Sequence, residues 1–149
     1  MGEIQIISVS EKWRKELVDM FSEVSAGDTP RLFHPHEFTE EKADELIKSV
    51  DSYYLVLDDG IPVGYGMLRG WAEGYEIPSL GIYISESQRG TGLAKLFMIF
   101  LHFAAKNRGA KKVRLKVYKD NVKAVKLYES LGYELQNLND EEYLGFIEL

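Results

Sequence analysis

Apolar residues alternate with polar ones in several short stretches of this chain and recur every three to four residues in longer ones. Alternation is typical of a half-buried strand, and the longer spacing is typical of one face of a helix. One helical stretch follows Ser10, and three others span residues 40–50, 93–107 and 121–131. Strand-like stretches span residues 3–9, 53–57, 61–71, 77–84, 112–118, 133–138 and 143–149.

The order of these elements predicts the fold class. It is strand, helix, helix, strand, strand, strand, helix, strand, helix, strand, strand. Strand–helix–strand units in the second half imply a parallel pairing with a right-handed crossover. The sequence DDG at residues 58–60 is a tight-turn signal and predicts a hairpin between the second and third strands. We predict an α/β (α+β) fold with a mixed sheet of about seven strands and about four flanking helices.

Particular residues predict where the helices begin and end. Ser10, Thr39 and Asp120 each precede a helical stretch, and their side chains can accept hydrogen bonds from its first N–H groups. Gly109 and Gly132 each follow a helical stretch, where glycine readily adopts the left-handed conformation that closes a helix.

Three segments are expected to deviate from a regular, half-exposed element. Pro78 and Gly81 weaken a strand ladder, so the strand over 77–84 should be irregular or bulged. Apolar residues surround the 93–107 helix almost completely, which predicts a mostly buried helix. The apolar stretch 143–149 is a candidate edge strand, and an exposed edge would allow a homodimer.

Composition narrows the class of protein. The length of 149 residues and the apolar content of 45% fit one domain over residues 1–149. The net charge of −6 disfavours nucleic acid as a partner. No apolar run approaches the roughly 20 residues of a membrane helix, and the N-terminal sequence lacks the layout of a secretion signal. The chain has no cysteine, which excludes disulfides and thiolate chemistry, and we expect a cytoplasmic protein.

A glycine-containing loop stands between a predicted strand and the apolar 93–107 helix. Its sequence QRGTG places Gly90 and Gly92 just before the helix. A helix N-terminus binds phosphate where glycine lets the ligand approach the backbone N–H groups, and Arg89 would add positive charge. Taken alone, the glycines favour an ordinary strand-to-helix turn, because the loop has neither GxxxxGK[ST] nor the third glycine of GxGxxG.

A second motif follows about thirty residues later. Asn121, Ala124 and Tyr128 are spaced i, i+3 and i+7 and share one side of a helix. The motifs IxxxxRGxGLA over 84–94 and NxxAxxxYExxGY over 121–133 together resemble those of the GNAT family, the GCN5-related N-acetyltransferases. The element order also fits the fold of that family.

The resemblance implies that acetyl-CoA is the donor substrate. Its pyrophosphate would lie on the N–H groups of the glycine loop, and its pantetheine arm would pair with the preceding strand like an added strand. That pairing requires the neighbouring strand to splay away, and Pro78 and Gly81 are candidate causes. The implied donor-binding residues are Ile82, Tyr83, Ile84, Arg89, Gly90, Thr91, Gly92, Leu93, Ala94, Asn121, Ala124 and Tyr128.

Acetyl transfer from sulfur to an amine releases a thiolate and requires a neutral amine. A tyrosine, with a reference pKa near 10, can protonate the thiolate, and Tyr128 is the candidate for this role. Glu76 is the candidate base, because the family often carries one near this position, and Glu73 and Tyr83 are alternatives. A backbone N–H near Ile82 would meet the oxyanion.

The acceptor is implied to be a primary amine, and we expect a small molecule such as an amino sugar, a polyamine or an antibiotic. Alternatives are a protein N-terminus or lysine, and an acyl-CoA-binding regulatory module without turnover. The histidine pair in FHPHEF lacks further metal ligands, so no metal site is predicted. Candidate acceptor-binding residues are Phe33, His34, His36, Trp71, Glu73 and Tyr75.

Overall fold

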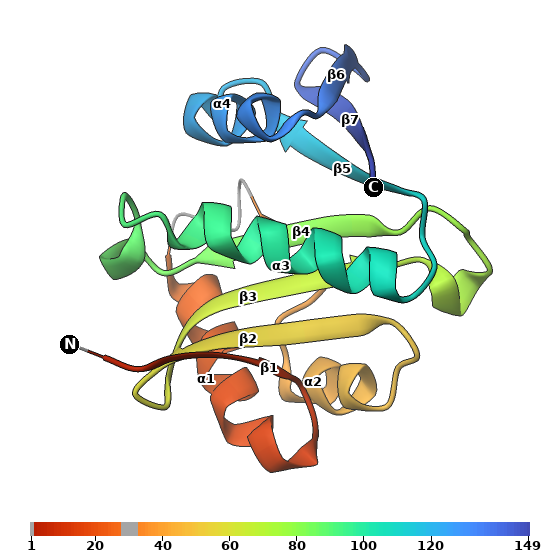
Figure 1. The fold of residues 1–149 in the computed structure, drawn as a ribbon. Helices are drawn as coiled ribbons and strands as arrows, with labels where there is room; N and C mark the ends of the chain where they lie inside the picture. The colour runs from red at the N-terminus through yellow and green to blue at the C-terminus, as the bar shows by residue number, and fades with distance from the viewer. Residues whose placement is uncertain (1, 28–32) are drawn as a thin grey trace.

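A computed structural model of the protein describes residues 2–27 and 33–149. Within these residues seven strands form one mixed sheet in the order β1-β2-β3-β4-β5-β7-β6 (Figure 1). Among the described strands only β4 and β5 pair in parallel, which confirms the predicted parallel pair across the 93–107 helix. The strands are β1 Ile4–Ser8, β2 Ser52–Asp58, β3 Ile61–Arg69, β4 Ser79–Ile84, β5 Lys112–Tyr118, β6 Glu134–Asn137 and β7 Glu142–Glu148.

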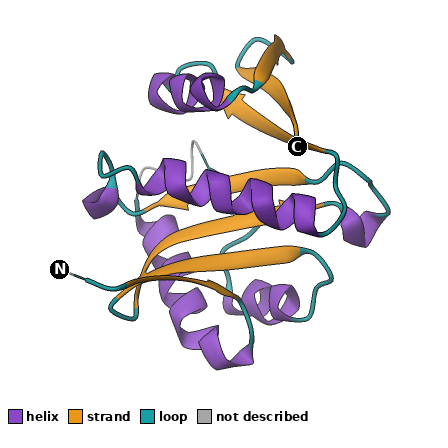
Figure 2. Cartoon of the chain, viewed as in Figure 1, coloured by secondary structure: helices purple, strands orange, loops and turns teal. Residues whose placement is uncertain are grey.

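Helices cover both faces of the sheet (Figure 2). Two pack on one face and two on the other, so each face has its own apolar core. Along β3 the side chains alternate between these cores: Tyr65 and Met67 face α1 and α2, and Leu68 faces α3. The helices are α1 Arg14–Ala26, α2 Glu40–Ile47, α3 Leu93–Asn107 and α4 Val122–Leu131, with short 3-10 helices η1 Glu11–Trp13, η3 Trp71–Glu73 and η4 Glu86–Gln88.

The predicted helix starts are confirmed at one position and shifted at two. Thr39 caps α2, because its hydroxyl accepts the N–H of Lys42 at 3.1 Å. Ser10 makes no side-chain cap, since its backbone carbonyl accepts the N–H of Trp13 and closes η1 before α1 begins. Asp120 precedes the cap position of α4, which is occupied by Asn121.

The expected bulge in β4 is wrong. β4 pairs with β3 in continuous register, and the register shift lies instead between Val56 and Leu57 on β2. Pro78 precedes the strand, so no ladder hydrogen bond is lost. Gly81 faces β3, where an added Cβ would lie 3.2 Å from Met67 Cγ. Its missing side chain makes room for Met67 and does not bend the strand.

Helix α3 packs closely on β3 but is less buried than expected. A Cβ added at Gly66 would lie 2.5 Å from Phe97 Cζ, so this glycine allows the helix to approach the sheet. However, Leu96, Ile99 and Phe103 are exposed on the outer side of α3. One helix can bury only the side that faces the sheet, and no further described element covers this apolar face.

The last strand is not an edge strand, so this expectation for 143–149 is wrong. Strand β7 lies between β5 and β6, and the two edges are β1 and β6. The short β6 pairs back onto β7 and takes the outer position. None of the helices in the described part of the chain is long and apolar enough to span a membrane.

Candidate active site

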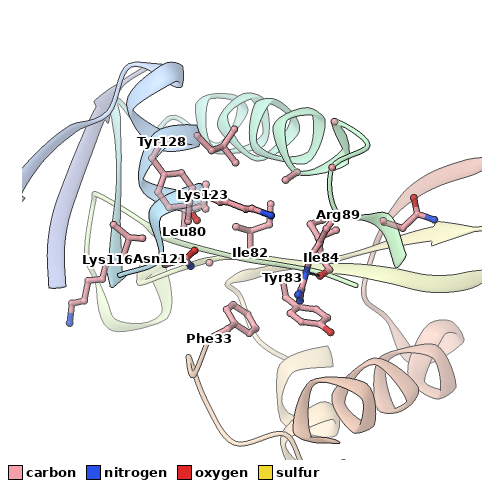
Figure 3. A pocket seen from close by; sticks show the side chains of 18 residues that line it. Phe33, Leu80, Ile82, Tyr83, Ile84, Arg89, Lys116, Asn121, Lys123 and Tyr128 are labelled. Carbon is pink, nitrogen blue, oxygen red and sulfur yellow. Dashed lines mark hydrogen bonds between the residues drawn. The ribbon is translucent and has the colours of Figure 1, made fainter. Parts of the chain in front are cut away.

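Strands β4 and β5 separate after a single bridge between Ser79 and Arg114, so the predicted splay is present. A cavity of about 540 Å³ occupies this region, between β4, the glycine loop, β5 and α4. All predicted donor-binding residues except Thr91 and Leu93 line it. These lining residues are Ile82, Tyr83, Ile84, Arg89, Gly90, Gly92, Ala94, Asn121, Ala124 and Tyr128 (Figure 3).

The edge of β4 that borders the cavity has open backbone groups. Ser85 N–H donates to the carbonyl of Val63 on β3 at 2.9 Å. Because hydrogen bonding alternates along an antiparallel ladder, Tyr83 also bonds to β3, and the backbone groups of Ile82 and Ile84 point toward β5. Within the described residues Ile82 has no strand partner on that side. An extended amide ligand can therefore pair with it.

The glycine loop presents N–H groups to the same cavity. Gly90 and Gly92 have φ angles of 78° and 91°, which glycine adopts readily. Thr91 shapes the turn, since its hydroxyl donates to the Gln88 carbonyl at 2.6 Å. The N–H groups of Gly90, Gly92 and Ala94 have no protein partner in the described part of the chain. These groups at the start of α3 suit an anion.

Arg89 holds the loop against the end of β4. Its Nε donates to the Ile84 carbonyl at 3.1 Å, and its backbone N–H donates to Glu86. The guanidinium carbon lies 5.9 Å from the centre of the Tyr83 ring. Arg89 therefore lines the cavity with its side chain directed toward Tyr83 and not over the loop N–H groups (Figure 3).

Tyr128 projects from α4 into the cavity (Figure 3). Its side chain is buried, and its ring lies 5.7 Å from that of Tyr133. Burial raises the pKa of Tyr128 to about 12, so the hydroxyl keeps its proton at physiological pH. Within the described residues this hydroxyl has no hydrogen-bond partner. It is a protonated donor directed at the space beside β4.

Two lysines of the lining were missing from the sequence prediction. Lys123 extends from α4 across the cavity above Ile82, whereas Lys116 on β5 directs its ammonium away (Figure 3). A lysine in the first turn of a helix opposes the helix dipole unless an anion is near. The position of Lys123, two residues after Asn121, was thus the available signal in the sequence.

The segment between β3 and β4 lies away from the cavity lining. Glu76, Glu73 and Tyr75 are exposed there, and Trp71 stacks against Arg108 with 3.7 Å between ring centre and guanidinium carbon. Hydrogen bonds from the N–H groups of residues 70 and 72 to the Asp51 carboxylate hold this segment beside the start of β2. The structure therefore does not bring these predicted base and acceptor residues together with Tyr128.

Of the predicted residues in FHPHEF, only Phe33 lines the cavity. His34 is exposed. The Nδ1 of His36 donates to the Glu37 carbonyl at 2.6 Å, and its Nε2 accepts the Tyr65 hydroxyl at 2.8 Å. Its ring lies among the aromatic side chains of the α1–α2 core. His36 thus fastens this loop to the sheet. Across the described residues, no group of three or more His, Cys, Asp or Glu side chains could hold a metal ion.

Burial lowers the pKa of His36 to about 4, and this predicts a pH-dependent stability. Between the unfolded value of about 6.5 and about 4, the unfolded chain binds a proton that the folded chain excludes. The contribution of His36 to the free energy of unfolding is therefore at its full value above about pH 6.5. It declines by up to about 3 kcal/mol as the pH falls toward 4. Urea unfolding at pH 7 and pH 4.5 measures the loss.

The matched variants for this measurement are His36→Gln and His34→Gln. We expect His36→Gln to lose less stability between the two pH values than the wild type does, because glutamine does not titrate. His34→Gln should behave like the wild type, since His34 is exposed. An unchanged pH dependence in His36→Gln would contradict the assignment. Burial also lowers the pKa of His102, so part of the wild-type loss should remain.

A carboxylate that the sequence prediction missed adjoins the cavity wall. The hydroxyls of Tyr83 and Ser85 donate to the same Oε2 of Glu23 on α1, at 2.7 and 2.6 Å. Ser85 is buried, so this contact also satisfies a polar group that has lost its water. The Phe33 and Tyr83 rings lie 5.9 Å apart on this side of the sheet. Glu23 therefore adds negative charge behind the part of the wall that Tyr83 forms.

Comparison with known proteins gives one consistent result. The model of the Acetyltransferase (GNAT) family matches residues 10–133. The uncharacterized N-acetyltransferase YdgE of Bacillus subtilis is 31% identical over 127 residues, which are 72% of this chain and 78% of that protein. An acetyltransferase of the GNAT family from Streptococcus pneumoniae aligns over 99% of this chain and 100% of its own, with a TM-score of 0.79 and 20% identity. PaiA N-acetyltransferase from Thermoplasma acidophilum, solved with coenzyme A, aligns over 99% of both chains, with a TM-score of 0.81 and 14% identity.

Proposed function

Because this chain belongs to the GNAT family of acetyltransferases, we propose that it transfers the acetyl group of acetyl-CoA to a primary amine of a small molecule. The observation that carries the proposal is the cavity between β4 and β5, which joins open backbone groups, a phosphate-suited helix start and a protonated tyrosine.

The donor would occupy the opening between the two strands. Its amide-rich pantetheine arm is extended, as is the edge of β4 at Ile82, and the N–H groups of Gly90, Gly92 and Ala94 suit its pyrophosphate. Lys123 supplies a further positive charge on the α4 side. The resemblance to a protein solved with coenzyme A supports the same donor.

The proposed reaction needs one proton donor at the sulfur. The cationic amine first gives one proton to water and becomes neutral. Its nitrogen then bonds to the thioester carbonyl carbon, the carbon–sulfur bond breaks, and the nitrogen loses a second proton to water. The thiolate takes a proton from the Tyr128 hydroxyl, which regains one from solvent. A tyrosine with a pKa of about 12 is a weak acid. However, the burial that raises its pKa would also raise the pKa of the CoA thiol, so the difference between the two pKa values would be smaller.

The acceptor side favours a cationic amine. Glu23, behind Tyr83, gives this side a carboxylate whose orientation two hydroxyls fix. The Phe33 and Tyr83 rings border the cavity and suit an acceptor with some apolar surface. We therefore place small amines that are cationic in solution, polyamines and amino sugars, first among the acceptors.

Release of the CoA thiol in the presence of an amine panel tests the proposal. We expect amine-dependent release with polyamines or amino sugars, and product analysis should show one added acetyl group. Release only with peptides that carry a lysine or a free N-terminus would reject the small-molecule acceptor and support a protein acceptor instead. Acetyl-CoA binding in calorimetry without release by either panel would favour the regulatory module, and no binding would contradict the donor assignment itself.

A further inference from the structure

One face of the sheet is only partly covered by helices. On the side of α3, no helix of the described chain lies over β1 and β2 (Figure 1). Ile6 pairs with Val56, whose side chain belongs to the core on this side, so Ile4 and Ile6 face the same way. Tyr54 of β2 also packs against this core. These residues form an apolar shelf beside α3.

The outer side of α3 continues the shelf as a ridge. Leu96, Ile99 and Phe103 are spaced i, i+3 and i+7 and are 53%, 50% and 70% exposed. Phe100 lies between ridge and shelf, with its ring 5.0 Å from that of Tyr54 and nearly perpendicular to it. Ridge and shelf are thus one continuous apolar surface, and such a surface marks an interaction site.

The two ends of this surface carry opposite charge. Just before α3, the Gln88 side chain donates to Asp58, so this end adjoins the β2–β3 turn with the exposed Asp59. The exposed Glu3 lies beside that turn, because its N–H donates to Asp59. At the other end, Arg108 donates to the Val50 carbonyl, and Lys106 is exposed. Helix α3 itself contains no acidic residue, and the exposed Lys95 in its first turn lies at the end beside Asp58, where the carboxylates outnumber it.

We propose that this surface is the interface of a homodimer, with α3 of one protomer antiparallel to α3 of its partner. A two-fold axis that passes between ridge and shelf, level with the middle of α3, sets the ridge of each copy against the shelf of the other. The same rotation sets the acidic end over the partner's basic end, twice. A second copy is the occupant because the ridge of one copy can pack on the shelf of the other, and the acidic end of one can meet the basic end of the other.

Sedimentation velocity over a concentration series tests this interface. We expect the wild type to dimerise and Phe103→Glu to weaken the dimer on the order of 30-fold, because it buries a charge at the centre of the contact. Val122→Glu is the matched control, since Val122 is 54% exposed but lies on α4, away from the surface. Acetyl-CoA binding by Phe103→Glu should stay at the wild-type value, because Phe103 does not line the cavity.

An exchange of charges between two exposed residues gives the second test. It changes no apolar residue, so its result does not depend on a change in packing. Lys106→Glu should weaken the dimer, and adding Glu3→Lys to it should restore association, because both pairs across the axis then attract again. We expect a dissociation constant on the order of 1 μM. A wild type that stays monomeric at a protein concentration of about 100 μM overturns the proposal. Equal weakening by Val122→Glu, or no restoration in the double variant, overturns it as well.

Discussion

The Gly92→Glu variant is expected to lose acetyl-CoA binding by about 10²-fold or more in calorimetry. Gly92 stands at the cap position of α3, and an added Cβ would meet no protein atom within 4 Å. The new side chain would therefore occupy the space in front of the loop N–H groups, where the pyrophosphate is proposed to lie. Its carboxylate would also repel the phosphates, and each charge-assisted hydrogen bond that is lost weakens binding by about 1.5–3 kcal/mol.

Gly109→Glu is the control for backbone strain in this experiment. Gly109 has a φ of 95°, close to the 91° of Gly92, and an added Cβ there also meets nothing within 4 Å. It follows the opposite end of α3, so the variant carries the same strain and the same charge without touching the cavity. Wild-type affinity in Gly92→Glu, or an equal loss in Gly109→Glu, would contradict the phosphate assignment.

The Tyr128→Phe variant is expected to lower kcat on the order of 10²-fold and leave the affinity for acetyl-CoA nearly unchanged. Phenylalanine keeps the buried ring and removes only the hydroxyl that faces the cavity. Because the pKa of Tyr128 is about 12, the wild-type kcat should show no loss below about pH 10 that arises from this group. Steady-state kinetics with the best amine of the panel, over a pH series, measure both effects.

Tyr133→Phe separates an acid role from a packing role. Tyr133 is the neighbouring buried tyrosine, and its hydroxyl bonds to His102 Nε2 at 2.7 Å. Its variant should lose stability and keep kcat within a few-fold. If the two variants lose kcat equally, Tyr128 acts through packing and the acid assignment is wrong.

The element order could be predicted from local signals in the sequence, and most of the cavity lining from two motifs that resemble those of the GNAT family. Alternation and helical spacing located the strands and helices, and the Gly90–Gly92 loop sits at a helix start that its own residues define. Thr39 illustrates the same point, since a cap depends on residues three positions apart. Local chemistry of this kind is readable without a fold.

The remaining predictions depended on contacts between distant segments. Glu76 was a candidate base because the family often carries one near this position. However, Asp51, far earlier in the chain, holds the segment before β4 at the end of the strand that is opposite to the glycine loop. Glu23 joins Ser85 across 62 positions, and no local spacing signals such a pair. Similarly, β7 is interior only because β6 folds back over it. Strand order and side-chain partners of this type arise from packing.

The single bridge between β4 and β5 also determines where local unfolding of the molecule should begin. Each other neighbouring pair of strands is joined along several residues, so this position is the weakest seam of the sheet. Opening with a low free energy should begin there, with β5, β7, β6 and α4 moving away from the larger part of the sheet. A donor that occupies the seam would fasten the two parts, and its binding energy would add to the free energy of unfolding. The proposed donor would thus also stabilise the sheet in which it binds.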